Sequence, residues 1–144
     1  MNRIILNETS YYGAGCRTAI ADEIKKRGFS KVLLVTDKDL IKFGVAAKIE
    51  EVLKNADIPY EIYSEIKPNP TIKNVLDGLA AFKASGADCM VALGGGSSID
   101  TAKAIGIINN NPETVSTDFD TAAQLPCLKI SAQRLPSKVN LVVL

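Results

Sequence analysis

The sequence predicts an α/β fold in which a layered, mostly parallel sheet carries helices on both faces. Short apolar segments alternate with longer segments whose apolar residues recur at helical spacing. Helical connections of this length suit right-handed crossovers between parallel strands. Of the 144 residues, 47% are hydrophobic, which is enough to form the core of one compact domain.

The first quarter of the chain predicts two strands with a turn and a helix between them. Residues 3–6 are a short strand candidate, and the glycines of residues 11–15 mark a turn. Apolar residues at helical spacing predict a helix over residues 16–27, and Gly28 is a natural stop. The continuous aliphatic run of residues 31–36 predicts a strand that is covered on both faces.

The middle of the chain predicts two more helices and the strand between them. An amphipathic stripe over residues 45–53 predicts a helix that ends before Pro59. Residues 60–63 alternate polar and apolar side chains, which predicts a strand exposed on one face. A further helix is expected over residues 72–85, ending at Gly86. Its apolar side is formed by Val75, Leu76, Leu79 and Phe82.

The last predicted strand covers residues 89–93, and a glycine turn and a helix over residues 98–108 follow it. From residue 114 onward the alternation of elements is lost. The expected division is therefore an α/β domain over residues 1–113 and a divergent, truncated or poorly ordered tail over residues 114–144. Residues 139–144 are either a strand or a truncated or disordered terminus.

Composition excludes several classes of function. The 17 Lys and Arg residues nearly balance the 16 Asp and Glu residues, so we expect neither a nucleic-acid nor a membrane partner. No apolar segment reaches the roughly 18 residues of a membrane span, and the N-terminus does not resemble a signal peptide. We therefore expect a soluble, cytoplasmic protein. The sequence contains no histidine, which excludes His-dependent catalysis and imidazole metal ligands.

The glycine turn is the first candidate site. Gly94, Gly95, Gly96 and Ser97 connect a predicted strand to a predicted helix, where backbone N–H groups and the helix dipole favour a bound anion. The turn fits a pyrophosphate, or it is only a tight connection. It matches neither the Gly-x-Gly-x-x-Gly fingerprint nor the Walker pattern.

Asp37 and Asn69 follow two other predicted strands, so all three segments should reach the same edge of the sheet. Asp37 either accepts hydrogen bonds from the ribose hydroxyls of NAD or caps the segment that starts at Lys38. Asn69 lies between two prolines, so its amide is either held rigidly toward a ligand or belongs to an ordinary turn.

Asp100 and Lys103 lie in the helix that follows the glycine turn. Asp100 either contributes to the cofactor site or serves the first turn of the helix electrostatically. Lys103 either lies near bound phosphates or forms an ordinary ion pair with Asp100 one turn away.

Three motifs together resemble the iron-containing (group III) alcohol dehydrogenases. They are Thr36-Asp37-Lys38, Pro68-Asn69-Pro70-Thr71 and Gly94-Gly95-Gly96-Ser97-x-x-Asp100-x-x-Lys103. The match is ordered from the N-terminus to about Glu113, and its flanking residues are most similar to the lactaldehyde reductase (1,2-propanediol oxidoreductase) branch.

The resemblance implies a Rossmann-like domain that binds NAD, with hydride transfer between NAD(H) and a small alcohol or aldehyde. It implies cofactor contacts at Asp37, Asn69, Gly94, Gly95, Gly96, Ser97, Asp100 and Lys103. Complete members also have a helical domain in which one Asp and three His hold Fe²⁺ or another divalent metal. The resemblance further implies a possible homodimer through the strand at residues 3–6.

The chain departs from the family pattern in two ways. Residues 124–138 contain no glycine and no Pro-Thr-Thr-Ala-Gly loop, and the chain has neither the metal domain nor its ligands. We therefore expect the N-terminal, cofactor-binding portion of such an enzyme, inactive by itself. The alternatives are a non-catalytic nucleotide-binding or interaction module and the product of an interrupted gene.

Overall fold

The computed structural model describes residues 10–110 and 141–143. The strand expected at residues 3–6 and most of the segment from residue 114 onward lie outside these ranges. The described elements are η1 (Cys16–Thr18), α1 (Ala19–Lys26), β1 (Val32–Val35), α2 (Lys38–Lys42), α3 (Val45–Asn55), β2 (Tyr60–Tyr63), α4 (Ile72–Ser85), β3 (Cys89–Ala92), α5 (Gly96–Asn110) and β4 (Leu141–Val143).

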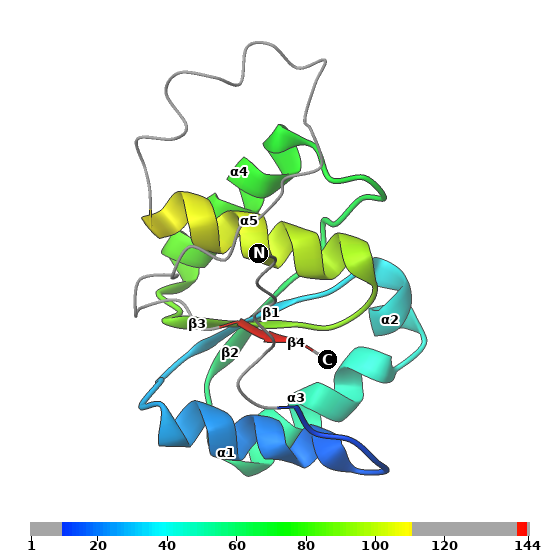
Figure 1. The fold of residues 1–144 in the computed structure, drawn as a ribbon, viewed down its shortest axis with the longest axis vertical. Helices are drawn as coiled ribbons and strands as arrows, with labels where there is room; N and C mark the ends of the chain where they lie inside the picture. Colours follow the sequence, from blue (N-terminus) through cyan, green and yellow to red (C-terminus); the bar gives the residue numbers. More distant parts are fainter. Residues whose placement is uncertain (1–9, 111–140, 144) are drawn as a thin grey trace, which may run out of the picture.

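The described strands form one parallel sheet in the order β2-β1-β3-β4. Figure 1 shows α1 and α3 on one face of this sheet and α4 and α5 on the other. The predicted α/β class, with a mostly parallel sheet between two helical layers, is confirmed. Residues 141–143 pair with β3, so of the two alternatives for this part of the chain the strand is the one observed.

Burial explains why these segments form strands at these positions. Every residue of β1 and β3 is buried, as expected for aliphatic runs covered on both faces. Strand β2 pairs with β1 alone among the described residues and is more exposed. Its Tyr63 is buried, whereas Ile62 is 38% exposed.

Helix boundaries follow the capping signals in most places. Helix α4 covers the predicted range and ends at Gly86, and the structure adds Thr71 as its N-cap. Leu76, however, is 36% exposed and does not join the buried side. Gly44, at a φ of 72°, separates α3 from the short helix α2, which the apolar periodicity does not predict. Among the described residues, no helix is long and apolar enough to cross a membrane.

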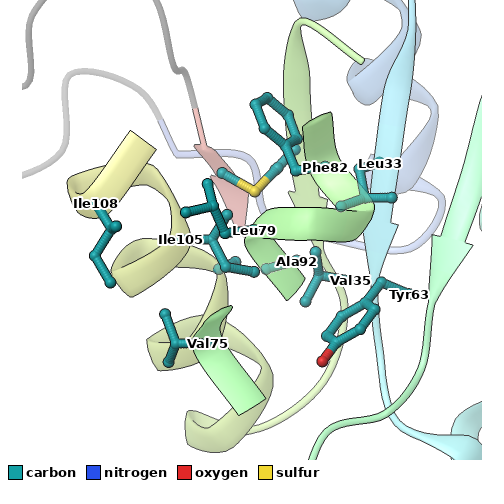
Figure 2. Close-up of a cluster of buried hydrophobic side chains, with 11 residues drawn as sticks. Leu33, Val35, Tyr63, Val75, Leu79, Phe82, Ala92, Ile105 and Ile108 are labelled. Atoms are coloured by element: carbon teal, nitrogen blue, oxygen red, sulfur yellow. The ribbon is translucent and has the colours of Figure 1, made fainter. Parts of the chain in front are cut away.

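The sheet divides the interior into two apolar clusters. Helices α1 and α3 pack with Val32 and Leu34 of β1 on one face. Helices α4 and α5 pack with Leu33 and Val35 on the other, and Figure 2 shows Leu79 of α4 beside Ile105 of α5 in this second cluster. Gly78 makes that approach possible, because a Cβ there would lie 2.5 Å from the Ile105 side chain.

Candidate cofactor-binding site

The order of strands creates a distinct position between the carboxyl ends of β1 and β3. These strands pair directly, with Val35 opposite Ala92. After β1 the chain turns into α2 and α3 on one face, whereas after β3 it turns into α5 on the opposite face. Parallel α/β proteins bind ligands where neighbouring strands send the chain in opposite directions.

Asp37 and Gly94 meet at this position. Asp37 follows β1, and Gly94 follows β3 with a φ of +135° that L side chains rarely adopt. A Cβ at Gly94 would lie 3.3 Å from Asp37 Oδ2 and 2.8 Å from the hydroxyl of the buried Ser98. The turn therefore requires glycine, and its tight geometry brings the Asp37 carboxylate against the start of α5.

The two carboxylate oxygens of Asp37 lie in different surroundings. Oδ1 accepts a hydrogen bond of 2.8 Å from the backbone N–H of Leu40, so Asp37 is the N-cap of α2. Oδ2 lies beside the glycine turn. The capping alternative is therefore correct for Oδ1, and no described hydrogen bond occupies Oδ2 beside the glycine turn.

The glycine turn is shorter than the sequence predicts, because α5 begins at Gly96 instead of residue 98. Gly96 and Ser97 thus belong to the first helical turn, whose N–H groups lack partners within the helix. A Cβ at Gly95 or Gly96 would meet nothing within 4 Å. The positive end of this 15-residue helix therefore has open space beside Gly95 and Gly96.

Asp100 and Lys103 are exposed on α5. Among the described residues no ion pair joins the two side chains, so the ion-pair alternative for Lys103 is not observed. No hydrogen bond within the described ranges connects either side chain to Asp37 or to the glycine turn.

Asn69 has a left-handed backbone, with a φ of 53°, between its two prolines. Its loop starts next to Asp37, because Glu65 forms an isolated antiparallel bridge with Asp37. The Glu65 carboxylate also lies 2.7 Å from Lys38 Nζ. The start of the loop thus belongs to the same edge of the sheet, although no described contact joins the Asn69 side chain to Asp37.

Two residues near the site were missed by the sequence reasoning. The hydroxyl of Thr36 is buried without a hydrogen-bond partner among the described residues. Asn74 is buried in α4 and makes hydrogen bonds to both ends of the Asn69 loop. The spacing Thr71-x-x-Asn74 resembles a capping box and could have indicated Asn74, but no sequence signal marks Thr36 as unpartnered.

The described residues do not fit an iron site. No group of three or more His, Cys, Asp or Glu side chains comes together within residues 10–110 and 141–143. The whole sequence also contains no histidine. The described part of the sheet edge therefore offers no ligand set of the kind that holds iron or zinc.

The comparison with protein families decides the classification. Residues 7–138 match the model for iron-containing alcohol dehydrogenases. The chain belongs to this family. The match extends past Glu113, where the recognisable motifs of the sequence stop.

Individual family members place the chain in the N-terminal part of the family. Lactaldehyde reductase of Escherichia coli (strain K12) is 53% identical over 112 residues, which are 78% of this chain and 29% of that protein. Choline dehydrogenase of Bacillus subtilis (strain 168) is 42% identical over 77% of this chain and 27% of that protein. The chain thus spans less than a third of the length of these relatives.

Solved structures agree with this classification. The crystal structure of a 1,3-propanediol oxidoreductase superposes with a TM-score of 0.73 at 36% identity, covering 76% of this chain and 28% of that one. An NADH-dependent butanol dehydrogenase A from Thermotoga maritima gives 0.66 at 32% identity, covering 73% and 27%. The fold is therefore that of the N-terminal domain of iron-containing alcohol dehydrogenases.

Proposed function

We propose that this chain is the NAD-binding portion of a dehydrogenase related to lactaldehyde reductase. The complete enzyme would exchange a hydride between NAD(H) and a small alcohol or aldehyde, such as 1,2-propanediol or lactaldehyde. One observation carries the proposal: the free oxygen of Asp37 lies beside a glycine turn that opens the N-terminus of α5. A ribose acceptor and a phosphate site are then adjacent, as a dinucleotide requires.

Each side of the site would contact a different part of the cofactor. The backbone of residues 94–97 would bind the pyrophosphate, because Gly95 and Gly96 leave room for close approach to the N–H groups. Asp37 Oδ2 would accept the ribose hydroxyls and repel a 2′-phosphate. Asn69, Asp100 and Lys103 remain proposed contacts, and residues 1–113 remain the proposed cofactor domain. A homodimer through residues 3–6 also remains a proposal, since that strand lies outside the described residues.

The bound NAD would supply the hydride acceptor or donor, and the chain's own residues would bind and orient it. We expect the isolated chain to bind NAD weakly and not to oxidise 1,2-propanediol, because its residues do not fit the metal site of complete family members. Metal-dependent oxidation of 1,2-propanediol by this polypeptide alone would contradict that expectation.

Calorimetric titration of the chain with NAD, NADP and AMP tests the proposal. Asp37→Asn keeps a good N-cap for α2 but removes the charge at the ribose position. We expect NAD affinity to fall about tenfold, since hydrogen bonds to a charged group are among the stronger ones. The discrimination against NADP should weaken at the same time.

Asp39→Asn is the matched control, because it removes the same charge from an exposed side chain in the same short helix. It should leave NAD affinity unchanged. Equal affinity of the parent chain for NAD and AMP would instead favour the nucleotide-binding module. Absence of binding to either would overturn the proposal.

A further inference from the structure

Asn74 makes more hydrogen bonds than helix capping requires. It is 6% exposed, at the third position of α4. Its Oδ1 accepts hydrogen bonds from the backbone N–H and the hydroxyl of Thr71, at 3.2 and 2.8 Å. These bonds form part of a capping box. Its Nδ2 also donates a hydrogen bond of 3.4 Å to the backbone carbonyl of Glu65.

The hydrogen bond from Asn74 to Glu65 fixes the far end of the loop that precedes α4. Residues 64–71 connect β2 to α4 and contain Asn69, and Asn74 holds residues 65–71 at both ends, at Glu65 and at Thr71. Tyr63 also holds Asn74, since its hydroxyl donates a 2.9 Å hydrogen bond to the backbone carbonyl of Asn74. Figure 2 shows the Tyr63 ring in the apolar cluster beside Val35, with its hydroxyl directed away from Leu33 and Phe82.

The same loop is linked to Asp37. Glu65 pairs with Asp37 through the backbone bridge and with Lys38 through the 2.7 Å ion pair. The Lys38 and Glu65 side chains are 65% and 62% exposed, so this ion pair is a weak restraint by itself. The Asn74 amide adds a second restraint at Glu65, and its burial makes the loss of that hydrogen bond costly.

We propose that Asn74 is a positioning residue for the cofactor site. It holds residues 65–71 at the carboxyl edge of the sheet, so that Asn69 and Asp37 keep a fixed relation when the adenosine half of the dinucleotide binds. This inference rests on the proposed NAD function. Because the loop between its ends is stiffened by Pro68 and Pro70, fixing both ends leaves Asn69 little freedom.

Asn74→Asp separates the two roles of the side chain. The carboxylate still accepts the Thr71 hydrogen bonds and suits the first turn of a helix. It cannot donate to the Glu65 carbonyl, so it releases that end of the loop. We expect the thermal midpoint to fall, because a carboxylate at this buried position faces the Glu65 carbonyl, and the dissociation constants for NAD and ADP-ribose to rise about three- to tenfold in the folded variant.

Ser85→Ala is the matched control for general loosening of α4. Ser85 is also 6% exposed, lies at the opposite end of the same helix, and bonds to the Phe82 carbonyl and the Ala87 N–H. It should lower the thermal midpoint without changing either dissociation constant. Asn74→Ser, which shortens the side chain and adds no charge, gives a second variant with the same readouts if the Asn74→Asp variant does not fold.

The outcomes distinguish the two proposals. If the parent chain does not bind NAD, the proposed function fails and the positioning role fails with it. If the parent chain binds NAD and a folded Asn74 variant binds equally well, only the positioning role is overturned. It is also overturned if binding weakens in parallel with the thermal midpoint in both the Asn74 and Ser85 variants. Weaker binding in a folded Asn74 variant, with Ser85→Ala binding normally, supports it.

Discussion

The two edges of the sheet each carry an aspartate, and the two side chains are used differently. At the amino edge, before β3, Asp88 accepts hydrogen bonds from the backbone N–H groups of Ser30 and Lys31 and from the Ser30 hydroxyl. At the carboxyl edge, Asp37 accepts a bond from Leu40 at one oxygen and directs the other toward the glycine turn. The amino edge is thus closed by internal bonds, whereas the carboxyl edge keeps polar groups available.

Asp88→Ala should produce the largest loss of stability. Three donors in the chain segment before β1 would lose their acceptor, and we expect the free energy of unfolding to fall by about 3 kcal/mol. Urea denaturation measures the loss. Asp88→Asn, which keeps one acceptor oxygen, should lose about half as much. Because the edge is remote from Asp37, NAD affinity should not change, and a large change would contradict the division between the edges.

The pH dependence of this effect follows from the pKa of Asp88. Partial burial alone would raise that pKa, but the hydrogen bonds from Lys31 and Ser30 outweigh it and lower the pKa below the ordinary value. A carboxyl group with a depressed pKa stabilises the fold above its unfolded pKa and loses that contribution as pH falls through the folded pKa. The stability difference between the parent chain and Asp88→Ala should therefore be full at neutral pH and shrink below about pH 4.

Gly94→Ala should have the next largest effect, and it acts at the carboxyl edge. The added Cβ would lie 2.8 Å from the Ser98 hydroxyl in a backbone conformation that alanine rarely adopts. We expect a loss of about 2 kcal/mol together with weaker NAD binding. Gly95→Ala is the control, because its Cβ meets nothing within 4 Å and should cost under about 0.5 kcal/mol. If Gly94→Ala cost as little stability as Gly95→Ala, the turn at Gly94 would not be tightly packed.

Thr36→Val should have the smallest effect, in the opposite direction. The buried hydroxyl has no partner among the described residues, so replacing it with a methyl group should stabilise the fold by up to about 1 kcal/mol. Thermal melting measures the change in stability, and titration with NAD measures the affinity for the cofactor. Unchanged NAD affinity is expected. A loss of affinity would instead assign the Thr36 hydroxyl to the cofactor site and add it to the polar groups available at the carboxyl edge.

Local signals in the sequence account for most of the fold. Helix α4 has the predicted range and ends at Gly86 as predicted, because a left-handed glycine acts on its immediate neighbours. The parallel orientation of the strands also follows from the helical connections, whereas their order in the sheet was not predicted. Helix α2 was not predicted as a separate element, since it has five residues and its stability depends on the Asp37 cap.

The candidate site was predicted in part. The sequence brings Asp37 and Gly94 to one edge of the sheet, but it cannot give the two environments of the Asp37 oxygens, which depend on a turn that follows a different strand. The bond between Ser30 and Asp88 spans 58 positions and has no local signature. Asn74 was overlooked because an asparagine in the first turn of a helix ordinarily acts on its own cap.

The direct pairing of β1 with β3 has a consequence for biosynthesis. The proposed cofactor contacts lie between residues 37 and 103, so they are complete once α5 has left the ribosome. N-terminal regions generally fold first during synthesis, and a ligand that binds only the folded state stabilises it. In a longer protein that continues beyond this region, NAD would then act on the nascent chain and favour early pairing of β1, β2 and β3 before β4 and later segments are translated.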